Sequence, residues 1–157
     1  MKKILITGAS GFIGRSLCKT LSTSGRSFRG AVRSIDSFSI VTKANYVSIG
    51  DITAKINWKD ALANIDCIIH LASTTNAEKS FGKKKEMFSN NLNCLNTVIK
   101  FCENTGAKLV HLSSTSVYGK QTSIVDETCE KKYLKPQSPY AKIKIMEENI
   151  LKKRTKF

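Results

Sequence analysis

The sequence predicts an α/β protein with a doubly wound parallel sheet, arranged as three α/β/α layers. Short apolar runs alternate along the chain with longer segments in which apolar residues recur at helical spacing. A glycine-rich loop directly follows the first apolar run and opens the first helical segment. The length of 157 residues and the hydrophobic content of 41% suit a single domain, residues 1–157, with a substantial core. Alternating strands and helices make the strands parallel, with helices on both faces of the sheet.

Five strands are expected, each from a run of four or five mainly apolar residues. They lie at residues 3–7, 28–32, 46–49, 67–71 and 109–112. Gly8 bounds the first run and Gly50 the third, which is typical of strands that end in tight turns. Because right-handed crossovers join parallel strands, a ligand is expected beyond their carboxyl ends.

Four helices are expected, at residues 12–24, 58–64, 84–104 and 140–153. Gly25 ends the first helix, Gly106 closes the third, and Pro139 introduces the last. Residues 119–138 form the longest irregular stretch of the chain. This stretch is polar and lies near the expected ligand site, so we expect it to act as a mobile lid.

The bulk composition argues against several classes of protein. No apolar run approaches the roughly 18 residues that a membrane span needs, and the N-terminal run ends at Thr7-Gly8, too soon for a signal peptide. We therefore expect a cytoplasmic protein. The five cysteines are spaced singly, which favours neither a disulfide framework nor a metal site. The net charge of +14 comes from scattered lysines and arginines without aromatic interleaving, so a solvated surface is favoured over a nucleic-acid interface.

The glycine-rich loop has the spacing of a dinucleotide-binding turn, with glycines at i, i+3 and i+6. Gly8 would permit the tight turn out of the strand, Gly11 a close approach of the main chain to a pyrophosphate, and Gly14 the packing of the helix. The helix N-terminus would then offer free N–H groups to the phosphates. The loop residues predicted to bind NAD(P) are Gly8, Ser10, Gly11, Phe12, Ile13 and Gly14.

The end of the second strand bears on the choice of dinucleotide. A carboxylate at this place would bind the ribose 2′-hydroxyl of NAD, but the chain has Arg33 and Ser34 there. Arg33 can pair with a 2′-phosphate, and Ser34 can add a hydroxyl, so NADP(H) is favoured over NAD(H). The alternative is that Arg33 is a surface residue and the choice of dinucleotide is loose.

A Tyr-x-x-x-Lys pattern, Tyr140 to Lys144, lies near the start of the last helix. Its i, i+4 spacing puts both side chains on one face of the helix. A free tyrosine has a pKa near ~10, and a neighbouring ammonium lowers this pKa and makes the phenol a better proton-transfer group. The alternative is an ordinary surface pair. The lone histidines, His70 and His111, are interpreted as structural, because each lies in an apolar strand.

Taken together, the motifs resemble the NAD(P)-dependent nucleotide-sugar epimerase/dehydratase family, the extended short-chain dehydrogenases/reductases, whose fold is the Rossmann fold. The matching segments, in family order, are residues 7–14, 50–52, 70–73, 90–93, 113–119 and 138–144. The resemblance implies that Ser114 binds the reacting sugar oxygen, Tyr140 moves its proton, and Lys144 binds the nicotinamide ribose and tunes Tyr140. It also implies that Asp51 and Ile52 lie against the adenine. Further cofactor contacts are implied for Leu71, Ala72, Ser73 and Asn91.

The departures from the family narrow the expected reaction. Dehydratases of the family carry an Asp-Glu pair where this chain has Thr115-Ser116, which argues against dehydration. Residues 30–34 and 58–62 look most like a branch of UDP-sugar epimerases and 4-keto-sugar reductases, so the resemblance favours a UDP-sugar 4-epimerase or a 4-keto-sugar reductase. The alternative is a non-catalytic NAD(P)-binding sensor or scaffold. Relatives run to roughly twice this length, so we expect the C-terminal sugar-binding region to be absent and the chain to be inactive alone. An uncovered sheet edge would then invite self-association. The resemblance implies a homodimer, because the family often pairs through two long helices, including the Tyr-x-x-x-Lys one.

Overall fold

The computed structural model describes residues 3–35, 45–53, 61, 63–75, 82 and 84–154. The described residues form two compact units. The sheet unit is drawn from Met1–Ser73 and Asn93–Leu112, and the α4 unit from Thr74–Leu92 and Ser113–Lys156. Among the described residues, every helix is too short or too polar to cross a lipid bilayer.

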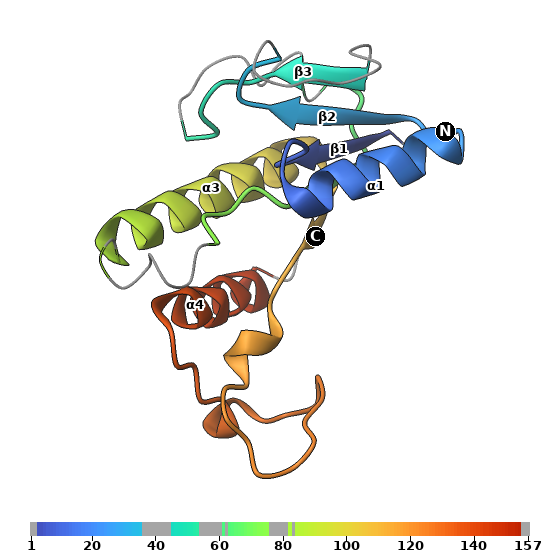
Figure 1. Ribbon diagram of the computed structural model, residues 1–157. Coiled ribbons are helices and arrows are strands. Elements are labelled where there is room, and N and C mark those ends of the chain that lie inside the picture. Colours follow the sequence, from blue (N-terminus) through green and yellow to red (C-terminus); the bar gives the residue numbers. More distant parts are fainter. Residues whose placement is uncertain are drawn as a thin grey trace. The chain divides into compact units, whose positions relative to one another are not determined.

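The sheet unit holds five parallel strands in the order β3-β2-β1-β4-β5 (Figure 1). The strands are β1 (Ile4–Thr7), β2 (Phe28–Val32), β3 (Tyr46–Ser48), β4 (Cys67–His70) and β5 (Lys108–His111). The chain runs outward from β1 through β2 to β3, and then returns to place β4 on the other side of β1. This reversal of strand order creates a topological switch point at the carboxyl ends of β1 and β4, where open α/β sheets bind ligands. The predicted doubly wound parallel sheet is confirmed.

One face of the sheet is covered by α1 (Phe12–Thr23). Ile6 of β1 is fully buried and belongs to a cluster with Cys18 and Leu21, which lie one turn apart on α1. Burying an aliphatic side chain of this size contributes roughly 1.5–3 kcal/mol. The helix therefore forms because its apolar stripe meets the sheet, and it ends before Gly25, whose φ of 65° continues no helix.

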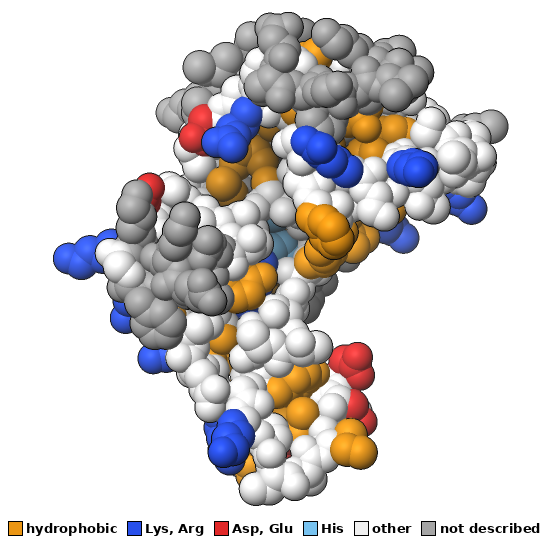
Figure 2. Space-filling view, in the orientation of Figure 1, with side chains coloured by type: hydrophobic (Ala, Val, Ile, Leu, Met, Phe, Trp, Pro, Cys, Tyr) orange, Lys and Arg blue, Asp and Glu red, His pale blue; other side chains and the backbone are white. Residues whose placement is uncertain are grey.

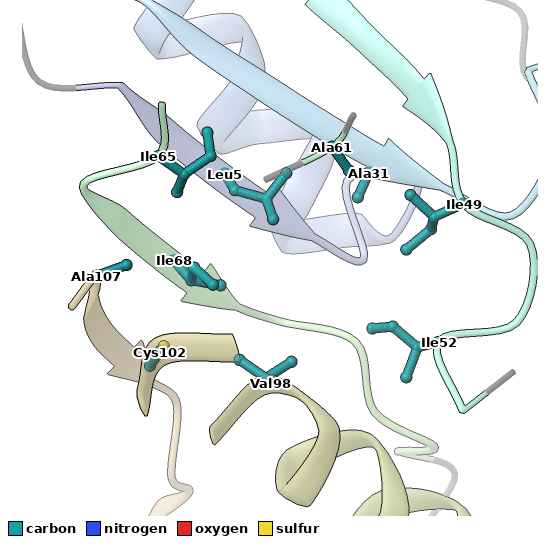
Figure 3. Close-up of a cluster of buried hydrophobic side chains, with 10 residues drawn as sticks. All are labelled: Leu5, Ala31, Ile49, Ile52, Ala61, Ile65, Ile68, Val98, Cys102 and Ala107. Atoms are coloured by element: carbon teal, nitrogen blue, oxygen red, sulfur yellow. The ribbon is translucent and has the colours of Figure 1, made fainter. Parts of the chain in front are cut away.

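The opposite face is covered by the second half of α3 (Lys84–Thr105). Leu5, which alternates with Ile6 along β1, packs with Ile68 of β4 and with Val98 and Cys102 of α3. Figure 3 shows these side chains converging between the strands and the helix. With α1 on the other face, the sheet unit has the three α/β/α layers that the sequence predicts.

The α4 unit contains α4 (Pro139–Lys153) and two short 3-10 helices, η2 (Thr115–Val117) and η3 (Lys131–Tyr133). Ser138 caps α4, because its Oγ accepts a hydrogen bond from the N–H of Ala141 at 3.1 Å. Pro139 takes the first helical position, where its missing N–H costs nothing.

The irregular stretch before α4, residues 119–138, is held by hydrogen bonds between its own residues and to Tyr118, which precedes it. The main chain of Lys135 donates to the carbonyl of Tyr118 at 3.1 Å. The Nε2 of Gln121 donates to the carbonyls of Tyr118 and Tyr133 at 2.6 and 2.8 Å. Gly119, with a φ of 65°, lies so close to Lys135 that a Cβ would be 1.8 Å from its carbonyl oxygen. The movement of this stretch as a lid stays a prediction.

β2 has its predicted bounds, and the bounds of the other strands and of α1, α3 and α4 differ from the predicted ones by one residue. β4 ends at His70 rather than Leu71, although the N–H of Leu71 still donates to the main-chain carbonyl of Thr7 at 3.3 Å. β5 is shifted one residue toward the N-terminus, to Lys108–His111. The helix predicted at residues 58–64 falls largely outside the described residues, and Asn64 there has a φ of 60°, which is not helical.

Candidate functional site

The glycine loop leaves β1 at the switch point and lies directly against the chain that leaves β4. Gly8 has a φ of 67°, and a Cβ on it would lie 2.7 Å from the nitrogen of Ala72. Gly14 closes the loop from the other side, since a Cβ there would lie 2.2 Å from the carbonyl oxygen of Gly8. The predicted role of Gly8 in the tight turn is confirmed. Gly14 makes room for the loop's own main chain, rather than for the sheet.

A threonine that the sequence interpretation left out holds this junction together. The Oγ1 of Thr7 lies 2.7 Å from Nδ1 of His70 and accepts the N–H groups of Leu71 and Ala72 at 3.2 and 3.3 Å. Because the oxygen already accepts two N–H groups, its own proton is assigned to Nδ1 of His70. His70 is buried and stacks on His111, with ring centroids 5.5 Å apart. The structural role predicted for His70 is confirmed.

Replacing Thr7 with valine is expected to lower the free energy of unfolding by about 2 kcal/mol, because valine keeps the shape but removes the buried hydroxyl that three polar groups share. Thr7→Ser, which retains the hydroxyl, is the matched control and is expected to cost less than about 1 kcal/mol. Urea unfolding of both variants measures the difference. Equal losses in the two variants would show that packing, and not the hydroxyl, holds the junction.

The amino end of α1 opens directly from the glycine loop. Gly11 is the N-cap residue and brings no side chain to cap the helix, and the first turn contains no acidic residue. The first N–H groups of a helix have no acceptor within it, so those of Phe12, Ile13 and Gly14 are available to an anion. The Nε of Arg15 donates to the carbonyl of Ser10 at 2.9 Å and fixes the loop from outside. The side chain of Phe12 is 95% exposed.

The chain segments that follow β2 and β3 lie side by side. The N–H of Gly50 donates to the carbonyl of Arg33 at 3.2 Å. The carboxylate of Asp51 accepts the side-chain hydroxyl and the main-chain N–H of Thr53, both at 2.7 Å. These two hydrogen bonds, with a smaller contribution from Arg33, hold the pKa of Asp51 below its ordinary value. Asp51 is therefore an ionised acceptor at this edge, whereas the side chain of Ile52 is buried in the cluster of Figure 3.

The segment after β4 carries a buried hydroxyl. Leu71 and Ala72 are held by Thr7, as described above. The Oγ of Ser73 is buried and has no hydrogen-bond partner among the described residues. Buried hydroxyls in folded proteins nearly always have a partner. Together with the close-packed glycine loop and the uncapped start of α1, this orphaned hydroxyl fits a bound polar ligand at the switch point.

The α4 unit carries the predicted reacting side chains and three predicted cofactor residues, Asn91, Tyr140 and Lys144. Ser114 caps η2, and its Oγ lies 2.8 Å from Oγ of Ser116 and accepts the N–H of Ser116 at 3.2 Å. η2 packs against α4. The side-chain amide of Asn91 makes two hydrogen bonds to the main chain of Thr74. Its Oδ1 accepts the N–H of Thr74 at 2.7 Å, and its Nδ2 donates to the carbonyl of Thr74 at 3.1 Å. Asn91 thus fixes the chain just after Ser73.

Tyr140 and Lys144 share one face of α4, as predicted. The Nζ of Lys144 lies 5.7 Å from the centre of the Tyr140 ring. The same Nζ makes an ion pair of 2.8 Å with Glu147, and both side chains are buried. Sequence interpretation missed Glu147, although a glutamate three residues after the lysine of the pattern was the available signal. Among the described residues, no three His, Cys, Asp or Glu side chains gather as a metal site would require.

A model of the NAD dependent epimerase/dehydratase family matches residues 4–156. The chain belongs to this family. The match covers both the glycine loop in the sheet unit and the Tyr-x-x-x-Lys helix of the α4 unit, so the two sets of residues belong to one known family pattern.

Three relatives illustrate the range of this family. The dTDP-D-glucose 4,6-dehydratase of Dictyostelium discoideum is 27% identical over 96% of the chain and 40% of its own length. The uncharacterized UDP-glucose epimerase YtcB of Bacillus subtilis is 27% identical over 94% of the chain and 50% of its own length. The solved structure of MoeE5 in complex with UDP-glucose and NAD is 28% identical, with a TM-score of 0.78, over 94% of the chain and 47% of its own. The chain thus spans about half the length of these family members, or less.

Figure 2 shows how the Lys and Arg side chains are distributed on one face of the molecule. The Lys and Arg side chains drawn on this face stand mostly apart, among uncharged side chains. Among the side chains drawn in colour, they do not join into one continuous stripe.

Proposed function

We propose that the chain binds NAD(P) at the switch point and serves hydride transfer on a UDP-sugar, as a 4-epimerase or a 4-keto-sugar reductase. The observation that carries this proposal is the contact of the glycine loop with Ala72, next to the uncapped start of α1. Such a junction brings main-chain N–H groups to a pyrophosphate without side chains in the way. The family membership and the NAD and UDP-glucose bound to MoeE5 support it.

The sheet unit supplies the proposed dinucleotide site. The N–H groups of Phe12 and Ile13 bind the pyrophosphate at the positive end of α1, beside Ser10, Gly11 and Gly14. Asp51, ionised and held by Thr53, accepts the amino group of the adenine. The remaining cofactor contacts are proposed for Arg33, Ser34, Ile52, Leu71, Ala72 and Ser73.

The α4 unit supplies the proposed proton-transfer groups. Ser114 donates a hydrogen bond to the reacting sugar oxygen, and Tyr140 takes or gives the proton of that oxygen. Lys144 stabilises the phenolate of Tyr140 and binds the nicotinamide ribose. The nicotinamide, when bound, supplies the acceptor or donor of the hydride.

The residues after Ser114 favour epimerisation or reduction over dehydration. Elimination of water needs an acid and a base next to the sugar, and family dehydratases place an Asp-Glu pair there. This chain has Thr115 and Ser116, and the hydroxyl of Ser116 is engaged with Ser114. A dinucleotide retained through purification would indicate an epimerase, which regenerates its cofactor in each cycle. Stoichiometric consumption of NADPH would indicate a reductase.

Calorimetric titration of NADPH and NADH into the chain tests the cofactor site. We expect both to bind, and NADPH to bind about tenfold more tightly, because one charge-assisted hydrogen bond from Arg33 to the 2′-phosphate contributes roughly 1.5–3 kcal/mol. Arg33→Ala is expected to weaken NADPH alone. Arg26→Ala, which removes an exposed arginine between α1 and β2, is the control. A preference for NADH would overturn the role of Arg33, and binding of neither dinucleotide would overturn the site.

A further inference from the structure

The buried ion pair on α4 is a feature that the proposed proton-transfer chemistry leaves unused. Nζ of Lys144 and Oε2 of Glu147 lie 2.8 Å apart, and the two side chains are only 4% and 2% exposed. A buried ammonium is expensive unless it is paired, because burial disfavours the charged form. Lys144 is the residue whose charge the proposed role of Tyr140 depends on.

The surroundings of Lys144 make Glu147 its main counter-charge among the contacts described. η2, which packs against α4, contributes Thr115, Ser116 and Val117, none of which titrates. The next carboxylate on the helix, Glu148, instead accepts a hydrogen bond from Ser113 and lies 3.8 Å from Lys152. The cation that η3 presents to α4, Lys131, bonds to Asn149 at 2.6 Å.

We propose that Glu147 is a positioning residue of the candidate site: its carboxylate keeps the buried amine of Lys144 protonated and holds it beside Tyr140. The geometry supports a relay along one helix, in which Glu147 fixes Lys144 from one turn below and Lys144 faces the Tyr140 ring at 5.7 Å. Through Lys144, Glu147 favours the phenolate of Tyr140. The value of this relay to catalysis rests on the proposed function, whereas the pairing itself does not.

Removal of the Glu147 carboxylate is expected to shift the titrations of Lys144 and Tyr140 in opposite directions. Without the carboxylate, the buried amine of Lys144 is expected to lose its proton at lower pH, because the opposite charge that lies 2.8 Å from its Nζ is gone. Tyr140 then ionises without a cation beside it, at higher pH. If Glu147 acted mainly by repelling the phenolate, its removal would have the opposite effect on Tyr140. The direction of the Tyr140 shift therefore separates the two roles.

The test is Glu147→Gln in the chain without cofactor. NMR titration of the lysine side chain is expected to move the midpoint of Lys144 down by about one pH unit or more. Ultraviolet titration of tyrosinate, with the Tyr140→Phe chain subtracted in each background, is expected to move the midpoint of Tyr140 up by about half a unit. Glu148→Gln removes the same charge one residue away and is expected to leave both midpoints in place. An unchanged Lys144 midpoint, or a lowered Tyr140 midpoint, overturns the proposal.

A second measurement tests the Lys144–Glu147 pairing even where Glu147→Gln impairs folding. The loss in melting temperature caused by Glu147→Gln is compared in the natural chain and in a Lys144→Met chain. A large loss beside Lys144 and a small one beside Met supports the pairing, because only the former removes the carboxylate from beside a buried ammonium. Equal losses overturn it. Since no step requires a dinucleotide, failure of this test is distinct from failure of NADPH or NADH to bind.

Discussion

Replacing Gly8 with alanine is expected to cost about 3 kcal/mol or more of folding free energy and to abolish dinucleotide binding. Two separate penalties add at this position. The φ of 67° costs a residue with a Cβ roughly 1–2 kcal/mol. The new Cβ would also lie 2.7 and 2.9 Å from the main-chain nitrogen and Cα of Ala72, and such overpacking costs about 1–3 kcal/mol. Because the crowding atoms are main chain, β1 and the segment after β4 have to separate.

Gly25→Ala is the matched control for this substitution. Gly25 has nearly the same φ, 65°, but nothing lies within 4 Å of a Cβ placed there. It is therefore expected to lose only the conformational part, roughly 1–2 kcal/mol, and to bind the dinucleotide as before. Urea unfolding and calorimetry measure both variants. If Gly8→Ala proved no more harmful than Gly25→Ala, the close contact between the glycine loop and Ala72 would not be what shapes the site.

The fold was predictable from sequence where local signals fix the element ends. β2 is found at its predicted bounds, and α1 ends at Thr23, two residues before Gly25, which was expected to terminate it. The end of β4 was not predictable in this way. The strand stops at His70, and the N–H groups of Leu71 and Ala72 that follow it donate to Oγ1 of Thr7, which lies 64 and 65 residues away in the chain. Contacts of this kind depend on which strands become neighbours, and the sequence pattern does not fix that.

The residues of the candidate site were likewise predictable only where their roles are local. Gly8, Gly14, Tyr140 and Lys144 follow from spacing, because positive φ, close approach and a shared helix face are local properties. The Oγ1 of Thr7 and the buried carboxylate of Glu147 were missed, because a threonine in a strand and a glutamate in a helix are ordinary surface or core residues until their neighbours are known. The burial of Ile52 in the core was missed for the same reason.

Replacing Tyr140 with phenylalanine is expected to lower hydride transfer by about a hundredfold to ten-thousandfold, the usual contribution of a positioned acid–base group. Phenylalanine keeps the ring that faces Lys144 at 5.7 Å and removes only the hydroxyl that is proposed to move the proton. Dinucleotide affinity is expected to change by less than about tenfold, since one neutral hydrogen bond is lost at most. The reaction is followed by the absorbance of reduced nicotinamide and by NMR of the sugar, with UDP-glucose as the probe.

Tyr133→Phe controls for the chemical change itself, because Tyr133 lies on η3 and is 51% exposed. It is expected to leave the rate unaltered, whereas Ser114→Ala is expected to lower the rate in the same way as Tyr140→Phe. A Tyr140→Phe chain that retained the natural rate would remove Tyr140 from the reaction. A natural chain that binds the dinucleotide but neither reduces it nor converts UDP-glucose would match both the expected inactivity of the chain alone and a non-catalytic NAD(P)-binding module. In that case the Lys144–Glu147 pair would survive as a structural feature of α4, because its titration requires no turnover.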